Sequence, residues 1–400
     1  MSIPRPESYG AKGDGRIVDR KTNRNDHYVR GTDDSDAIRR CIREHGECWL
    51  QGKTYVIGSP LVFGPDDSPT KNVKIYGESN RRSILAFKGG RVANVSSAQE
   101  SMIKIQSGIE TFEIDELTIY CNGSNRLDGK GRRKTIGAVE SRAFTDLMAD
   151  LIVWGQTRAQ SECFTLGSWS DYPSDHKWAR GTTIIERIDF SRGPAHDPVS
   201  KDIPEITYII ACRRNGVRIS DNLFRDLPRL PEASPCRQQL ISFHGSNGVT
   251  IEGNVFENVD AHCVYADNMH AKNIRITGNS VRNSIGVFVF LLNSFASGSY
   301  ENMDISGNVV TMKRPKGSIG PSAIGVILSA HRDKNSDVFR DVHIHGNLFR
   351  VKDTVTAWDP AAILFQTPDL ALGFRNVIVS ENSKDAPIDL KTVPDGVKIQ

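Results

Sequence analysis

Residues 249–256 read VTIEGNVF, and this short pattern decides the fold because it recurs through the second half of the chain. Apolar and polar residues alternate, a Gly-Asn pair follows, and a second apolar run begins directly after it. Alternation with a period of two is typical of a β-strand with one buried face. The other copies are VRISDNLF (217–224), IRITGNSV (274–281), MDISGNVV (303–310), VHIHGNLF (342–349) and the weaker VIVSENSK (377–384).

The asparagines of these copies are spaced by 32, 25, 29, 39 and 35 residues. Such variation favours coils of nearly constant cross-section that carry loops of variable length. Helical repeats would need a period of 3.6 residues, which these segments lack. Asn suits a bent turn, because it tolerates left-handed backbone geometry and its amide can bond to neighbouring backbone. In stacked coils the amides could also bond to one another.

Another apolar run lies between each Asn and the next copy of the pattern. Three short parallel strands per coil therefore predict an all-β fold, a single-stranded right-handed parallel β-helix. Earlier, less regular coils are expected at 71–77, 112–120 and 182–190. The apolar runs between each Asn and the next copy are ISFH (241–244), VYAD (264–267), VFVFLL (287–292), IGVILS (324–329) and ILFQ (363–366).

An N-terminal capping helix is predicted over residues 33–44, because an open β-helix end would expose unpaired strand edges. Ala37, Ile38, Cys41 and Ile42 form an apolar stripe at helical spacing, and three aspartates stand near the helix start. We expect one β-helix domain over residues 1–400. The cap and first strands would occupy 1–65, the coils 66–385, and a C-terminal tail or cap 386–400.

Three motifs at the start of the chain resemble the opening of the pectate-lyase-like superfamily. They are YGAKGDG (9–15), TDDSDAI (32–38) and GKTYVIGSPLVF (52–63), in the order and spacing of that family, apart from an insert at 16–31. The superfamily contains polysaccharide lyases, glycoside hydrolases, uronate epimerases, fructan transferases and phage tailspike depolymerases. The resemblance therefore implies a carbohydrate ligand and leaves the reaction open.

Composition argues against several other classes of protein. Fifty-one basic and 48 acidic residues give a net charge of +3, too balanced to predict nucleic acid as a partner. The seven scattered cysteines contain no CxxC pair, so we expect buried free thiols and no metal site. Neither a signal peptide nor a membrane span is evident, which favours a cytoplasmic or phage-associated protein. No motif for a nucleotide cofactor occurs, and no cofactor is expected.

The candidate site follows from the alternation of side chains along the runs between the repeats. If Val264 and Ala266 point inward, Tyr265 and Asp267 point outward, and the same reasoning places His244 outside. The resemblance implies that this flank holds the ligand. The candidate catalytic residues are Asp267, Asp260, His244 and Tyr265, and the candidate substrate-binding residues are Arg213, Arg214, His262, Trp169 and His331.

These residues suit two kinds of cleavage of a polysaccharide or oligosaccharide. A glycoside hydrolase would use Asp260 and Asp267 as a carboxylate pair, whose separation across one turn and strand the sequence allows. A polysaccharide lyase would use His244, Tyr265 or Arg213 to remove a proton beside a uronate carboxylate. Hydrolysis is favoured over elimination. The alternatives are a non-catalytic glycan-binding module of the tailspike or adhesin kind, a uronate epimerase and a fructan transferase.

A homotrimer is also expected. Members of the superfamily such as tailspikes assemble side by side as trimers, and the run at 287–292 is apolar on both faces. Its outward residues, predicted as Phe288, Phe290 and Leu292, would need a cover other than water. A loop of the same chain, 295–302 or 313–321, is the competing cover.

Overall fold

A computed structural model describes most of the chain, in two compact units. The units are Met1–Ser168 with Gly181–Ala211, and Trp169–Arg180 with Cys212–Gln400. The described residues are 3–17, 29–68, 71–88, 90–91, 101–121, 126–127, 137–154, 163–167, 180–191, 208–227, 239–267, 270–293, 298–313, 323–330, 338–352, 361–367, 373–384 and 393–400.

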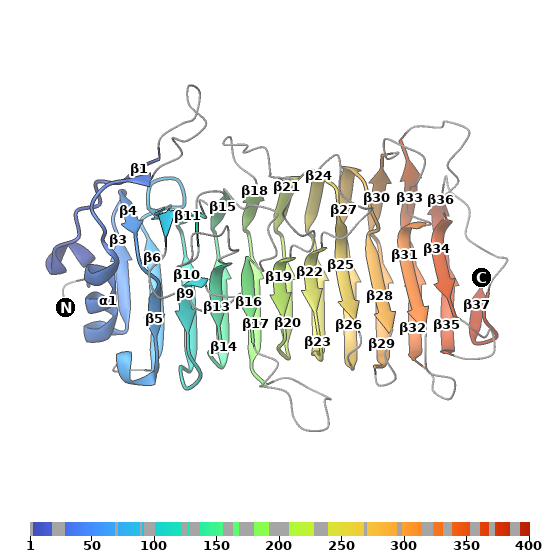
Figure 1. The fold of residues 1–400 in the computed structure, drawn as a ribbon. Helices are drawn as coiled ribbons and strands as arrows, with labels where there is room; N and C mark the ends of the chain where they lie inside the picture. Colours follow the sequence, from blue (N-terminus) through green and yellow to red (C-terminus); the bar gives the residue numbers. More distant parts are fainter. Residues whose placement is uncertain are drawn as a thin grey trace. The chain divides into compact units, whose positions relative to one another are not determined.

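The first unit contains three parallel sheets, each built from one strand of every coil (Figure 1). The first sheet holds β3 (Glu47–Leu50), β6 (Asn72–Gly77), β10 (Thr111–Asp115), β14 (Thr145–Ala149) and β17 (Thr182–Glu186). The second holds β4 (Thr54–Ile57), β7 (Ile84–Phe87), β11 (Thr118–Tyr120), β15 (Ile152–Trp154) and β18 (Asp189–Ser191). The third holds β5 (Leu61–Phe63), β9 (Ser101–Ile105), β13 (Gly137–Ser141), β16 (Phe164–Leu166) and β19 (Tyr208–Cys212), in which the unit boundary falls.

Shorter elements of the first unit lie outside these sheets. The shorter elements are η1 (Pro6–Tyr9), β1 (Arg16–Ile17), β2 (Val29–Arg30), α1 (Ser35–His45), η2 (Pro65–Asp67), β8 (Gly90–Arg91) and β12 (Arg126–Leu127). The insert at 16–31 begins with β1 and ends with β2, which form an antiparallel pair in which Ile17 faces Val29.

The second unit repeats the same three parallel sheets. Its first sheet holds β20 (Val217–Ser220), β23 (Asn247–Glu252), β26 (Ala271–Thr277), β29 (Tyr300–Ser306), β32 (Phe339–His345), β35 (Phe374–Ser380) and β37 (Val397–Ile399). The second holds β21 (Leu223–Leu227), β24 (Val255–Val259), β27 (Ser280–Ser284), β30 (Val309–Met312), β33 (Leu348–Val351) and β36 (Ser383–Lys384). The third holds β22 (Gln239–Phe243), β25 (His262–Asp267), β28 (Val289–Asn293), β31 (Ala323–Ala330) and β34 (Ala361–Gln366).

The chain passes from sheet to sheet in the order first, second, third, and each strand pairs in parallel with its counterparts in neighbouring coils. Val249 of β23, for example, lies between Val217 of β20 and Ile274 of β26. Stacked coils about 4.8 Å apart bury a continuous apolar interior. This arrangement confirms the predicted right-handed parallel β-helix.

Helix α1 covers β3 and β5 at the N-terminal end of the first unit (Figure 1). The four residues of the predicted apolar stripe are buried, each with at most 5% of its surface exposed: Ala37, Ile38, Cys41 and Ile42. The helix ends at Gly46, whose left-handed backbone (φ 75°) suits glycine. The predicted cap is therefore confirmed, with bounds shifted by one or two residues.

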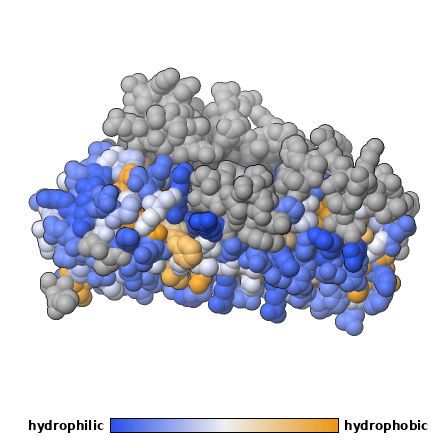
Figure 2. All heavy atoms as spheres, turned by 90° about the horizontal axis from the view of Figure 1, so that it is seen from below, coloured by the Kyte–Doolittle hydropathy of each residue, from blue (hydrophilic) through white to orange (hydrophobic). Residues whose placement is uncertain are grey.

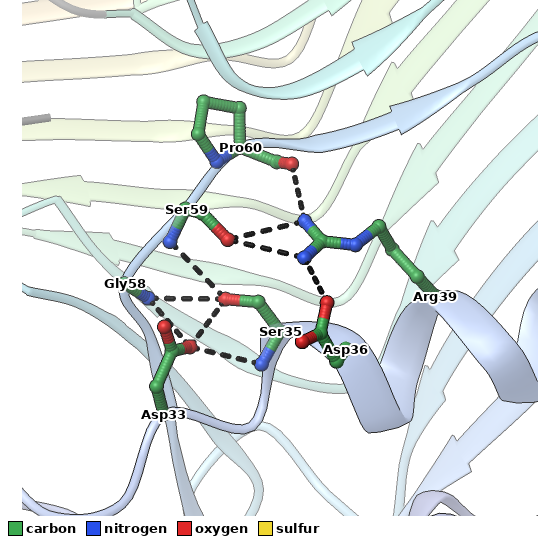
Figure 3. Close-up of polar contacts among 7 residues, drawn as sticks. All are labelled: Asp33, Ser35, Asp36, Arg39, Gly58, Ser59 and Pro60. Atoms are coloured by element: carbon green, nitrogen blue, oxygen red, sulfur yellow. Dashed lines mark hydrogen bonds and ion pairs between the residues drawn. The ribbon is translucent and has the colours of Figure 1, made fainter. Parts of the chain in front are cut away.

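Polar contacts attach the start of α1 to the loop between β4 and β5 (Figure 3). Asp33 Oδ1 accepts hydrogen bonds from the backbone N–H groups of Ser35 and Gly58, each at 3.0 Å. Arg39 donates to Pro60 O at 2.8 Å and pairs with Asp36. Carboxylates at this end of the helix also match its positive dipole.

The repeated asparagines form a hydrogen-bonded ladder in the second unit. Each side-chain N–H donates to the side-chain oxygen of the next Asn, over 2.8–3.0 Å. The backbone N–H of each rung donates to the same acceptor, for example Asn279 N to Asn308 Oδ1 at 2.9 Å. The predicted amide-to-amide bonding is confirmed. The ladder consists of Asn222, Asn254, Asn279, Asn308, Asn347 and Asn382.

The prediction that the Asn takes the left-handed turn conformation is wrong. The residue before the Asn takes it. Gly253 (φ 65°), Gly278 (φ 64°) and Asp221 (φ 55°) take this conformation, while the ladder asparagines do not. Glycine pays no steric cost there. In the first unit the rung position is apolar and buried, as in Leu117 and Leu151. Missing asparagines explain why those coils look less regular in sequence.

The polarity of the surface, the cysteines and the helix of the described residues can be compared with what the composition indicated. The face seen in Figure 2 is mostly hydrophilic over the described residues, with small apolar areas. Six cysteines are free and buried as predicted, and the seventh, Cys236, lies outside the described residues. No described helix is both long and apolar enough to cross a membrane.

Candidate functional site

Tyr265 and Asp267 lie on the outer side of β25, between β22 and β28 in the second unit. Ser242 lies beside Tyr265, and Tyr265 lies beside Phe290, in three consecutive coils. The intervening residue Val264 aligns with Ile241 and belongs to the buried core. The alternation read from the sequence therefore holds along Val264–Asp267.

Tyr265 and Asp267 form the polar centre of this surface. The Tyr265 hydroxyl donates a hydrogen bond to Asp267 Oδ2 at 3.2 Å. Tyr265 is 8% exposed, whereas Asp267, at the end of β25, is only partly buried. A phenol and a carboxylate in contact can exchange a proton, and the carboxylate remains within reach of a ligand.

His244 connects two coils of the site. Its Nδ1 lies 3.3 Å from the main-chain oxygen of Asp267, and its Nε2 lies 2.6 Å from Ser242 Oγ. Because a carbonyl only accepts hydrogen bonds, the proton of the neutral ring belongs on Nδ1, and Nε2 accepts from Ser242. His244 thus ties the end of β25, and with it Asp267, to the preceding coil.

His262 belongs to an aromatic cluster rather than to the polar centre. Its ring is stacked with Tyr265 at 6.2 Å between centroids and meets Phe290 edge-on at 5.2 Å. Tyr265 and Phe290 are also edge-on, at 5.7 Å. These contacts fix the Tyr265 ring, so that its hydroxyl has a defined position.

Two arginines follow β19 and lie beside His244. The backbone N–H of His244 donates to Cys212 O at 3.0 Å, and Arg213 and Arg214 come directly after Cys212. They are 6% and 2% exposed, and Arg214 Nη1 donates to Arg180 O at 3.2 Å. Two arginines in the coil next to His244 favour a ligand that carries an acidic group.

Tyr300 is a neighbour that the sequence analysis missed. Its hydroxyl donates to Leu292 O at 3.0 Å, and the side chain is fully buried. Burial raises its pKa, and the negative charge of Asp267 raises it further. Tyr300 opens a strand of the repeat at β29, where the pattern indicated only scaffold. The contact of Ser242 with His244 was likewise not predicted.

Asp260 stands at the other end of β25 from Asp267. It precedes the strand and pairs with Ile285, and its backbone N–H donates to Leu227 O. The six-residue strand between the two carboxylates is about 16 Å long at roughly 3.3 Å per residue. Acids that flank one glycosidic bond are about 5 to 9.5 Å apart. A strand of this length favours a separation larger than that range, and the catalytic Asp260–Asp267 pair stays a prediction.

Trp169 and His331 lie outside the described residues. Across the described part of the chain, no group of three or more His, Cys, Asp or Glu side chains is arranged to hold a metal ion.

Beyond Phe290 the outer surface of the third sheet becomes apolar. Phe290, Val287, Ile327 and Leu364 pack together, and Ile327 and Leu364 are 4% and 9% exposed. Phe288 was predicted to be exposed, but it is fully buried. Val287 packs in the outer cluster, whereas Val289 aligns with the core residue Val264. Inward and outward side chains therefore alternate only from Val289, the first residue of β28, and not from Val287.

The described residues thus form a right-handed parallel β-helix with a polar site on its third sheet. No model of a known protein family and no curated protein matches the sequence. The tailspike protein of E. coli bacteriophage HK620, solved with a pentasaccharide, has a similar structure. It is 13% identical with a TM-score of 0.53, and the match covers 96% of this chain and 63% of the tailspike chain.

Two further structures match over nearly their whole length. They are the A-modules of the Azotobacter vinelandii mannuronan C-5 epimerases AlgE6 and AlgE4, each 14% identical. The matches cover 99% of this chain and 97% and 99% of the modules, with TM-scores of 0.40 and 0.39. At 13% identity the likeness to the HK620 tailspike establishes the fold alone, which agrees with the resemblance seen in the sequence.

Proposed function

We propose that the protein is a carbohydrate-active enzyme that cleaves a chain containing acidic sugars by β-elimination. The contact between the Tyr265 hydroxyl and Asp267 Oδ2 at 3.2 Å carries this proposal, since it supplies a phenol beside a carboxylate able to take its proton. The pentasaccharide bound to the HK620 tailspike is consistent with a carbohydrate ligand on this fold.

Elimination fits the described residues better than hydrolysis. Asp267 is the one acidic residue in β22, β25, β28, β31 and β34, the described third-sheet strands of the second unit. A hydrolase needs two carboxylates on either side of the bond. Elimination instead needs a base and a cation that neutralises the substrate carboxylate, roles for which Tyr265 and the two arginines are suited.

The proposed proton path can be followed step by step. Asp267 accepts the Tyr265 proton, and the resulting phenolate removes the ring proton beside the substrate carboxylate. The C–H electrons form a ring double bond while the bond to the departing sugar oxygen breaks. Tyr265 then returns the abstracted proton to that oxygen. Arg213 and Arg214 bind the substrate carboxylate and make its neighbouring proton more acidic.

The test is a panel of acidic and neutral polysaccharides incubated with the wild-type protein and with Tyr265→Phe. Elimination produces reducing ends together with the ultraviolet absorbance of a conjugated double bond, and Tyr265→Phe should abolish both. Reducing ends without that absorbance indicate a hydrolase. An inverted uronate without cleavage indicates an epimerase, and binding without any reaction indicates a recognition module. Each of these three results would contradict the proposal.

A further inference from the structure

A hollow of about 680 Å³ lies in the first unit, on residues unrelated to the candidate active site. It is bordered by the N-terminal arm at Ile3 and Arg5, the turn from β3 to β4, and the residues that follow β6 and β10. The Trp49 backbone N–H donates to Pro4 O at 2.9 Å and holds the arm beside β3. The arm and the first coil together therefore form the walls.

Trp49 provides an aromatic wall. Tyr76 of the next coil packs against its ring, with 4.6 Å between centroids and 33° between planes. In the described first sheet β3 is the first strand, so Trp49 has a strand neighbour on one side, β6. Trp49 also lines the hollow. An indole held in place by a second ring can stack on the C–H face of a sugar ring.

The polar rim is built by close packing at Gly52. Glu78 Oε2 accepts a hydrogen bond from Gly52 N at 2.8 Å, and Glu78 pairs with Arg82. A Cβ atom at residue 52 would lie 2.9 Å from Glu78 Oε2 and 3.0 Å from Arg82 Nε. A glycine here lets the carboxylate and guanidinium lie against the turn, at the edge of the hollow.

Three further side chains that line the hollow have hydrogen-bonding groups to spare. The side chains of Arg5, Gln51 and Glu116 make no hydrogen bond or ion pair with other residues that the structure describes. Planar guanidinium, amide and carboxylate groups form paired hydrogen bonds, which suit adjacent hydroxyl groups on a ring.

Charge at the hollow distinguishes between classes of ligand. Arg82 is paired with Glu78, and Lys53 is paired with Glu7 at 3.1 Å, so Arg5 and Glu116 remain as one cation and one anion. Such a balance disfavours a phosphate or a polyanion, and the polar rim disfavours an apolar ligand. We propose that this hollow is a second carbohydrate-binding site, which takes a neutral sugar ring on Trp49.

Binding of neutral oligosaccharides tests this site. Cello-, malto-, xylo-, manno- and galacto-oligosaccharides are titrated calorimetrically into the wild-type protein, Trp49→Ala and Trp154→Ala. Trp154 is a matched control, because it packs against Tyr120 in the same unit, also with 4.6 Å between ring centroids, but does not line the hollow. At least one oligosaccharide should bind to the wild-type protein. Its affinity should be about tenfold or more lower for Trp49→Ala and unchanged for Trp154→Ala.

The result is separable from the proposed reaction. Tyr265→Phe should lose turnover and keep the neutral oligosaccharide, whereas Trp49→Ala should keep cleavage of short acidic chains. Arg5→Gln, which lies on the exposed arm, provides a second variant should Trp49→Ala melt at a lower temperature. No binding by any member of the panel, or equal affinity in wild type, Trp49→Ala and Arg5→Gln, would overturn the proposal.

Discussion

The Tyr265 hydroxyl and Asp267 Oδ2 are 3.2 Å apart on the same outer face of β25. Tyr265 is held by the rings of His262 and Phe290, and the main chain of Asp267 contacts His244 Nδ1. Both partners are therefore positioned by neighbours that do not themselves need to react. Such support is what a proton-transfer pair requires, because small displacements reduce its rate strongly.

Tyr265→Phe should remove activity while leaving the fold intact. The ring that packs against His262 and Phe290 stays, and one hydroxyl is lost. Loss of a general acid-base group typically reduces the rate about a hundred- to ten-thousand-fold. Turnover and melting temperature are measured together, with Asp226→Asn on the exposed part of β21 as a control for an unrelated acid. Activity within a factor of two of wild type would exclude Tyr265 from the mechanism.

Asp267→Asn and Asp260→Asn should behave differently, because a whole strand separates them. We expect a loss of about a hundredfold or more for Asp267→Asn and near wild-type turnover for Asp260→Asn. Initial rates on the same polysaccharide provide the comparison. Equal, large losses in both variants would indicate that the two carboxylates act together after all and would restore the hydrolase interpretation.

Asn279→Ala should strongly reduce the stability of the second unit. The change removes the Oδ1 acceptor shared by the Asn254 backbone N–H and side-chain amide, and it removes the side-chain donor to Ile251 O and Asn308 Oδ1. Asn308 Oδ1 then keeps only the Asn279 backbone N–H. Each buried polar group left unsatisfied costs about 1–3 kcal/mol. Denaturant unfolding should show a smaller loss for Asn382→Ala, the last and partly exposed rung. Equal losses would mean that the inner hydrogen bonds contribute little.

Asp115→Asn should stabilise the protein near neutral pH and have little effect in acid. Burial raises the pKa of Asp115 from 3.8 to about 6. A carboxyl with a raised folded-state pKa favours folding below the unfolded value, and this contribution is lost as the pH rises through the folded value. Thermal unfolding on both sides of this window measures the difference. A gain that does not depend on pH would contradict the account.

The side-by-side trimer stays a prediction, and the structure narrows where it would form. Phe290 and Leu292 are half-buried on the outer face of β28, whereas Phe288 is in the interior. Light scattering at micromolar concentration should give three times the 44.3 kDa chain mass. Phe290→Ser should lower that mass if this face is the interface. A monomeric wild-type protein would rule the trimer out.

Features with a strict period could be predicted from the sequence. The α1 stripe follows helical spacing, the Asn rungs recur from coil to coil in the second unit, and the structure confirms both. The left-handed residue was misplaced because Gly and Asn are adjacent and both tolerate that conformation. Phe288 was misplaced because alternation cannot show where a strand begins. The contact of His244 with the main chain of Asp267, and the effect of Asp267 on Tyr300, depend on coil-to-coil register, which sequence spacing alone does not give.

Cleavage of an acidic polysaccharide in heavy-oxygen water tests the central claim most directly. Hydrolysis adds solvent oxygen to the new reducing end, whereas elimination adds none and yields one fragment lighter by a water molecule. We predict unsaturated fragments without the heavy isotope, formed by wild type and not by Tyr265→Phe. The account would be contradicted by heavy oxygen in the newly formed ends, or by unsaturated products that Tyr265→Phe makes at the wild-type rate.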